Sequence, residues 1–235
     1  MVLPKLNDVP KYKLTVPSTN QDVTFRPFLV KEEKILLIAL ESQDPMQIAT
    51  AITDTVMSCI YEKINKNDLK SYDIEFLFLK IRAKSVGEKA DLVFKCEKCE
   101  TENDVNINIE DINIEVPKLD NRIKISNEIE VEMKQPTFES ISKNQKLLTN
   151  SPTTQVFGLI QESISAVLTE NERIDINDAT DEEFQEFIES MTQEQFTKIR
   201  EYIEKIPRLT HDIDYNCKSC DTKNSVTLEG LQSFL

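Results

Sequence analysis

The chain contains the stretch Cys96-Glu-Lys-Cys-Glu-Thr-Glu-Asn-Asp-Val-Asn-Ile107 and, 121 residues later, repeats its pattern as Cys217-Lys-Ser-Cys-Asp-Thr-Lys-Asn-Ser-Val-Thr-Leu228. Each stretch places a Cys-x-x-Cys pair before a run in which apolar and polar residues alternate. A Cys-x-x-Cys pair at a hairpin bend, followed by a half-buried strand, is one half of a zinc ribbon. The two halves together predict a tetrahedral structural zinc site with the ligands Cys96, Cys99, Cys217 and Cys220.

Other cysteine chemistries fit these pairs less well. A redox Cys-x-x-Cys pair normally lies between a strand and a helix, whereas both pairs here continue into strand-like sequence. Residues 1–8 contain no apolar signal region, so we expect the chain to stay in a reducing cytosol, where disulfides are rare. The fifth cysteine, Cys59, lies at helical spacing from Ile52 and Val56, which predicts a core residue.

Composition favours a globular protein that does not bind nucleic acid. The 235 residues are 39% hydrophobic, enough for one large core or two smaller ones, and no apolar run approaches the roughly 20 residues of a membrane span. The formal net charge of −14 argues against binding to a phosphate backbone. A local basic stripe of Lys80, Arg82, Lys84 and Lys89 is the best candidate for such binding, although a solvated helix face is its usual explanation.

Residues with catalytic patterns are scarce. The three glycines form no phosphate-binding loop, and the single histidine, His211, has no accompanying nucleophile motif. A catalytic zinc ion would also prefer three protein ligands and an open position, whereas four cysteines fill a tetrahedral shell. We therefore expect a protein that is not an enzyme.

A weaker repeat extends over the rest of the chain. Segments 13–25 and 122–133 each predict a β-hairpin that precedes a helix start, and Asp44-Pro45 and Ser151-Pro152 each supply a helix N-cap followed by proline. Amphipathic patterns recur in unrelated helices, so the argument depends on the same order of matches in both halves.

This order predicts an α+β fold with an internal duplication. Residues 1–117 form the first repeat and residues 118–235 the second, each with a β-hairpin, helices and a zinc-knuckle hairpin. The split four-cysteine zinc ribbon would then clasp the two halves near a pseudo-twofold axis. The expected helices are 30–42, 45–65, 72–86, 137–149, 152–168, 181–190 and 193–205.

The second repeat carries extra, acidic sequence. Residues 170–190 contain nine acids and one arginine; such a run is usually a solvated loop and helix face, and its functional interpretation is electrostatic guidance toward a basic partner. Thr180-x-x-Glu183 and Thr192-x-x-Gln195 are capping-box patterns that predict two helix starts nearby.

Two further phrases carry a family resemblance. Arg26-Pro-Phe-Leu-Val-Lys-Glu-Glu-Lys-Ile-Leu-Leu37 and Ile81-Arg-Ala-Lys-Ser-Val-Gly-Glu88 resemble T4-like bacteriophage baseplate proteins, a group linked to the central hub of contractile tails. The resemblance implies a non-enzymatic hub component or hub-assembly factor that is made in the host cytoplasm. Its implied partners are other tail baseplate hub proteins.

The first of these phrases also suggests contact residues. We expect Arg26, Lys31 and Lys34 to be exposed at the start of the first helix, where they would be candidate partner contacts. Without the resemblance, the cysteines alone leave an alternative open: a cytosolic zinc-ribbon adaptor that acts in transcription or nucleic-acid processing.

Overall fold

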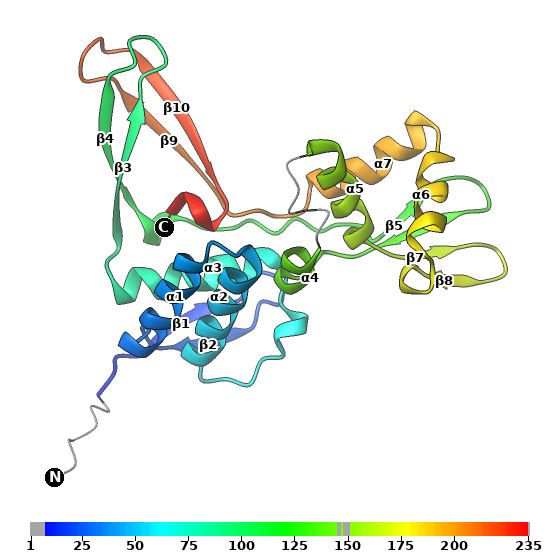
Figure 1. Ribbon diagram of the computed structural model, residues 1–235, viewed down its shortest axis with the longest axis horizontal. Coiled ribbons are helices and arrows are strands. Elements are labelled where there is room, and N and C mark those ends of the chain that lie inside the picture. The colour runs from blue at the N-terminus through cyan, green and yellow to red at the C-terminus, as the bar shows by residue number, and fades with distance from the viewer. Residues whose placement is uncertain (1–7, 145–146, 148–150, 235) are drawn as a thin grey trace. The chain divides into compact units, whose positions relative to one another are not determined.

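The structure is a computed structural model that describes residues 8–144, 147 and 151–234. The chain divides into two compact units. Unit 1 comprises Met1–Glu115 together with Arg208–Leu235, and unit 2 comprises Val116–Pro207. Both units combine helices with small antiparallel sheets (Figure 1). Among the described residues, no helix is long and apolar enough to span a membrane.

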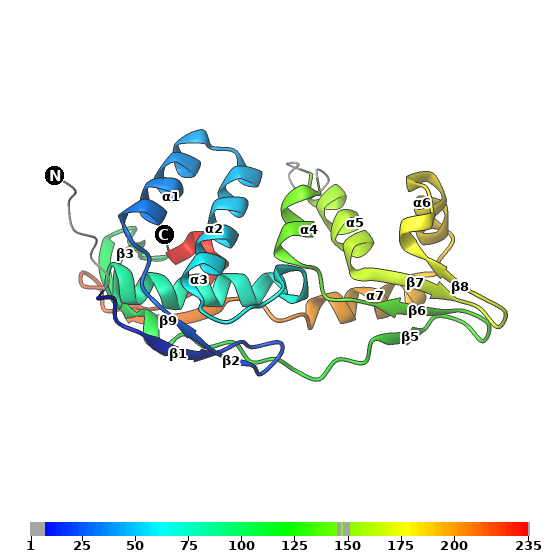
Figure 2. The same ribbon diagram turned by 90° about the horizontal axis from the view of Figure 1, so that it is seen from below.

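The described part of unit 1 contains three α-helices and three two-stranded hairpins. Helices α1 and α2 lie on one side of α3, and the β1–β2 hairpin lies on the other (Figure 2). The hairpins β3–β4 and β9–β10 pair only within themselves among the described strands. The elements are β1 (Tyr12–Thr15), β2 (Asp22–Phe25), α1 (Val30–Ser42), α2 (Pro45–Cys59), η1 (Lys66–Asp68), α3 (Ser71–Ser85), β3 (Lys89–Lys95), β4 (Glu102–Asn108), η2 (Ile109–Asp111), β9 (Thr210–Asn216), β10 (Lys223–Glu229) and η5 (Leu231–Phe234).

Helix α3 is the centre of the unit 1 core. Its side chains are buried nearly all round, with Leu77, Leu79 and Ile81 fully inaccessible to solvent. The helix starts at a carboxylate: Asp73 accepts hydrogen bonds from the backbone N–H of Lys70 and from the N–H and hydroxyl of Ser18. Asp73 therefore caps α3 and also fixes the turn between β1 and β2 against it.

Unit 2 is built on a four-stranded antiparallel sheet in the order β5-β6-β7-β8. Its helices start at side-chain caps, and the capping boxes predicted at Thr180 and Thr192 are both present. The elements are β5 (Arg122–Lys124), β6 (Glu130–Met133), α4 (Phe138–Lys143), α5 (Pro152–Ser163), β7 (Ile164–Leu168), β8 (Arg173–Asp175), η4 (Ile176–Asp178), α6 (Asp181–Glu189) and α7 (Gln193–Glu204).

Most predicted helices are confirmed, with changes at their ends. The helix at 30–42 has the predicted bounds. The helix predicted at 72–86 is shifted by one residue at both ends, and those at 181–190 and 193–205 are one residue shorter at the C-terminal end. The helix predicted over 45–65 ends at Cys59. The one predicted over 137–149 ends at Lys143, and 145–146 and 148–150 lie outside the described residues.

The predicted helix over 152–168 is wrong in its last third. Helix α5 ends at Ser163, and Ile164–Leu168 is strand β7, paired with β6. β6 pairs with β5 along one edge, and its other edge provides backbone hydrogen-bond partners for β7. In this strand, Ile164 and Ala166 lie two positions apart, so both side chains point into the core. Tertiary pairing therefore decides the conformation of this segment, and its helical pattern does not.

Candidate metal centre

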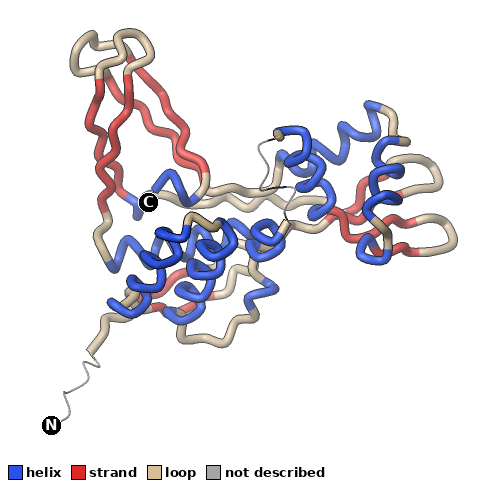
Figure 3. Tube along the Cα trace, viewed as in Figure 1, coloured by secondary structure: helices blue, strands red, loops and turns tan. Residues whose placement is uncertain are grey.

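The four cysteines lie in the turns of two matching hairpins of unit 1. Strand pair β3–β4 closes at Lys95 opposite Glu102, and β9–β10 closes at Asn216 opposite Lys223. Every partner pair in one hairpin has its counterpart 121 residues later in the other. The two hairpins lie side by side, with their turns at the same end (Figures 1 and 3).

Each turn has the same backbone geometry. In the first, the N–H of Cys96 donates to the carbonyl of Thr101 at 3.0 Å, and the N–H of Glu100 donates to the carbonyl of Cys96 at 2.9 Å. Glu100 has a φ of 56°, the left-handed conformation that reverses the chain after the second cysteine. In the second turn, the bonds run from Cys217 to Thr222 and from Asp221 to Cys217, and Asp221 has a φ of 52°.

The turns bring all four thiols together. Their Sγ atoms lie within 4.8 Å of one another, with Cys96 to Cys220 at 3.7 Å and Cys99 to Cys217 at 3.5 Å. Four thiolates at about 2.3 Å from a tetrahedral zinc ion lie about 3.8 Å apart. All five cysteines are free thiols, so the cluster could hold a metal ion.

Two buried asparagines connect the hairpins behind the thiols. The Oδ1 of Asn103 accepts a hydrogen bond from the backbone N–H of Lys218 at 2.8 Å, and its Nδ2 donates to the carbonyl of Thr101 at 2.7 Å. The matching bonds join Asn224 to the N–H of Glu97 at 3.0 Å and to the carbonyl of Thr222 at 2.8 Å. Each asparagine thus fixes its own turn and holds the opposite Cys-x-x-Cys loop. In the sequence, both asparagines occupy the same position of the repeated phrase. This shared position was visible, but it did not indicate which groups the asparagines would bind.

An aromatic pair joins the hairpins next to the asparagines. Phe94 and Tyr215 stack with ring centroids 5.9 Å apart, and the Tyr215 hydroxyl donates to the carbonyl of Lys95 at 3.1 Å. Phe94 and Tyr215 each lie two residues before the first cysteine of a pair. The contacts between the two hairpins therefore extend from the turns into the strands.

The backbone around the thiols favours the metal-binding form of cysteine. The N–H of Ser219 lowers the pKa of Cys217, burial opposes it, and the N–H of Cys220 lowers it further, to about 6. A thiol with a pKa near 6 is largely thiolate at neutral pH, and the thiolate is the form that ligates metals.

The other candidate residues lie away from this cluster. Cys59 is a buried residue at the end of α2, as predicted, and burial raises its pKa. His211 lies in β9 opposite Leu228. The cluster of possible metal ligands found among the described residues consists of the four cysteines and does not include His211.

The candidate basic stripe is not formed, and a solvated helix face does not describe it either. Lys80 is buried, and its ammonium donates to the carbonyls of Ile109 and Glu110. Lys84 pairs with two glutamates, and Arg82 is half-buried. Lys80 and Lys84 hold α3 to η2. The four side chains therefore form no continuous cationic face, and the nucleic-acid adaptor loses its best candidate surface.

The expected exposure at the start of α1 is correct for the lysines and wrong for Arg26. The Arg26 side chain is only 12% exposed, compared with 69% for Lys31, and Lys34 is also exposed. The Arg26 side chain is largely covered because its guanidinium donates to the carboxylate of Glu32 at 2.9 Å and to the carbonyl of Ser58 at 3.1 Å. It is a packing residue of unit 1 and cannot be a primary partner contact.

The described geometry is that of a protein with a four-thiol cluster, small antiparallel sheets and helical layers. The chain belongs to the T4 bacteriophage base plate protein family, whose model matches residues 9–235. This match confirms the resemblance seen at Arg26–Leu37 and Ile81–Glu88 and extends it over nearly the whole chain. No curated protein and no solved structure shows significant similarity to it.

Proposed function

We propose that this protein is a non-enzymatic component or assembly factor of the baseplate hub in a contractile phage tail. It acts through contacts with other hub proteins, beginning in the host cytoplasm where tails are built. The observation that carries this proposal is the family match over residues 9–235. The scarcity of catalytic patterns in the sequence agrees with it.

One structural zinc ion at Cys96, Cys99, Cys217 and Cys220 completes this proposal. The sulfur separations of 3.5 and 3.7 Å fit a tetrahedral site, and the buried asparagines supply the supporting hydrogen bonds that metal sites need. Zinc at such a site contributes on the order of 10 kcal/mol to folding at neutral pH. Its role is to clasp two hairpins that are far apart in the sequence.

The protein also consists, in this proposal, of two copies of one ancestral unit, residues 1–117 and 118–235. Supporting this, Leu14 pairs with Val23 in the first hairpin of the chain and Ile123 pairs with Val131 in the corresponding later one. Helices α2 and α5 both follow a side-chain N-cap and a proline. The second copy then carries an acidic insertion near Glu170–Asp178.

One detail changes the alignment of the two copies. Ile60 forms a bridge with Phe25 immediately after α2, and Ile164 pairs with Met133 immediately after α5. Ile164 is therefore the counterpart of Ile60, and α5 is shorter than α2 by three residues, 12 compared with 15.

The function is tested by deleting the gene from the parent phage and examining lysates by electron microscopy. The expected result is the loss of complete baseplates and its restoration by the wild-type gene in trans. A Cys217→Ser gene should complement poorly, while Cys59→Ser should complement normally. Normal tails in the deletion phage would refute the hub role. Mass spectrometry of purified virions then distinguishes a hub component from a transient assembly factor.

A further inference from the structure

Helix α1 exposes more apolar surface than an isolated unit can explain. It packs against α2 in unit 1, yet five of its thirteen residues are large aliphatic side chains that are 46–79% exposed. Large aliphatic side chains that are gathered and exposed on one helix commonly mark an interaction surface. The exposed residues are Val30, Ile35, Leu37, Ile38 and Leu40.

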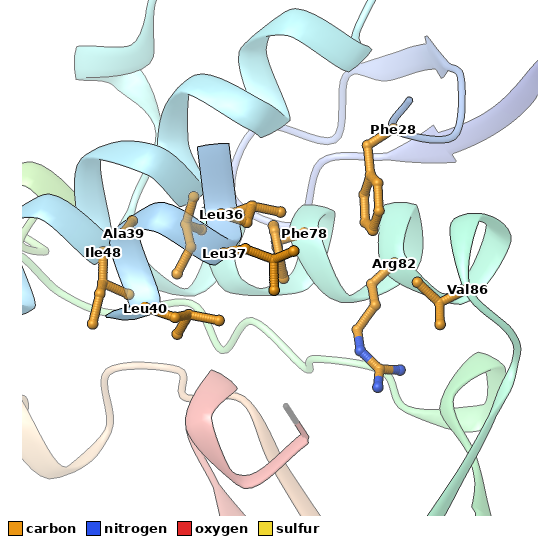
Figure 4. Close-up of a pocket in the computed structure, with 10 residues that line it drawn as sticks. Phe28, Leu36, Leu37, Ala39, Leu40, Ile48, Phe78, Arg82 and Val86 are labelled. Atoms are coloured by element: carbon orange, nitrogen blue, oxygen red, sulfur yellow. The ribbon is translucent and has the colours of Figure 1, made fainter. Parts of the chain in front are cut away.

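Part of this surface is hollowed. A depression of about 190 Å³ lies between α1 and the last turns of α3, and its lining is almost entirely apolar (Figure 4). Leu36, Leu37 and Leu40 supply one wall, and Phe28 and Val86 contribute to the rest. We call this surface the α1–α3 groove.

One charged side chain lines the α1–α3 groove. Arg82 extends away from the α3 ribbon beside Phe28 and Val86 (Figure 4). Its Nη1 is buried and has no hydrogen-bond partner among the described residues. By contrast, Arg26, Arg173 and Arg208 each pair with a carboxylate.

An unpaired, partly desolvated guanidinium is unfavourable in the free protein. A carboxylate is the group that best satisfies it, because the two form charge-assisted, often bidentate hydrogen bonds. Among the described residues, none of the acids forms an ion pair with Arg82, so a carboxylate of another molecule is the complementary group.

We propose that the α1–α3 groove binds an amphipathic helix of another tail protein, whose apolar stripe carries one aspartate or glutamate that pairs with Arg82. This inference rests on the proposed function. Thirteen residues of α1 form a surface about 20 Å long, which suits a helix of three to four turns laid along it. A second copy of this chain is a poorer occupant, because two chains of charge −14 repel each other.

Three labelled helical peptides of 15 residues test the inference. They share one leucine stripe and differ at a single central stripe position, which is Glu, Gln or Lys. Fluorescence anisotropy with the zinc-loaded full chain should give at least tenfold tighter binding of the Glu peptide than of the Gln peptide, and weakest binding of the Lys peptide. Arg82→Gln should abolish the difference between Glu and Gln. Leu37→Ser should weaken all three peptides.

Matched controls are Arg208→Gln, at an arginine outside the groove, and Val93→Ser, at an exposed valine of β3; neither should change peptide binding. Equal affinity for the Glu and Gln peptides, or binding of none, would overturn the inference. So would a dimer in sedimentation that Leu37→Ser dissociates, because a second copy would then fill the groove. The phage deletion is independent: intact tails with retained peptide discrimination would refute the hub role alone.

Discussion

Replacing Glu32 by glutamine should destabilise unit 1 strongly, although Glu32 is one of 42 acids in the chain. Glu32 is 3% exposed at the first turn of α1. One carboxylate oxygen accepts hydrogen bonds from Arg26 at 2.9 Å and from Lys31 at 3.1 Å, and the other accepts from the N–H of Leu29 at 2.8 Å. Glutamine keeps the shape and one acceptor but removes the charge, and so leaves the largely covered Arg26 guanidinium without its counter-ion.

The magnitude follows from the pKa. Burial alone would raise the pKa of Glu32, but the hydrogen bonds from Arg26, Leu29 and Lys31 outweigh it and lower the pKa from 4.5 to about 2. At 1.36 kcal/mol for each pKa unit, the charged form is favoured in the folded protein by about 3 kcal/mol. Removing one partner of a buried pair usually costs a similar 3–5 kcal/mol.

The assay is denaturant unfolding of the zinc-loaded protein across pH. Because the folded pKa lies below the unfolded value, this contribution is complete above about pH 4.5 and is lost as the pH falls toward 2. The difference between wild type and Glu32→Gln should therefore be about 3 kcal/mol at pH 7 and shrink steadily below pH 4.5. Glu33→Gln, at an exposed neighbour on the same turn, should change stability by less than about 0.5 kcal/mol. Equal stability of the two variants, or a difference that does not depend on pH, would refute the reasoning.

Three further predictions concern the metal centre and a second acid. Cys217→Ser should lose bound zinc and much stability, while Cys59→Ser should retain one zinc per chain by elemental analysis; zinc-free wild type purified without chelator would contradict the site. Asn103→Ala should weaken zinc binding about 10–100-fold in a chelator competition, and Asn106→Ala, at an exposed position of the same strand, should leave it unchanged. Burial, helped by repulsion from Glu229, raises the pKa of Glu75 to about 7, so its ionisation destabilises the fold as pH rises from 4.5 through 7. Glu75→Gln should therefore stabilise the protein at pH 8 and leave it unchanged near pH 4, and thermal melts at both values test this.

Sequence patterns predicted those features whose causes are local. The spacing within each Cys-x-x-Cys pair and the residues around it determine the knuckle turn, and the N-caps and capping boxes determine helix starts. The cluster of Cys96, Cys99, Cys217 and Cys220 could therefore be expected from the sequence alone, because two matching turns imply matching ends of a metal site.

The features that sequence patterns missed depend on distant partners. Residues 164–168 have helical spacing, and only the free edge of β6 makes them a strand. Arg26 reads as a surface residue until Glu32 and the carbonyl of Ser58 surround it. The asparagines Asn103 and Asn224 were visible as a repeated letter, but each one's partner lies in the opposite hairpin, more than 100 residues away in the sequence.

The return of residues 208–235 to unit 1 has a consequence for synthesis. Residue 217 leaves the ribosome 121 residues after residue 96, a delay of about 6–24 s at 5–20 residues per second. Unit 2 is contiguous and can fold during that interval. Cys96 and Cys99, in contrast, lack the other two thiols of the cluster until residues 217–220 have been made. A chain that stops even twenty residues short of position 235 lacks Cys217 and Cys220 altogether. Assembly of the four-thiol cluster therefore requires that translation has passed Cys220, and only such chains can complete unit 1.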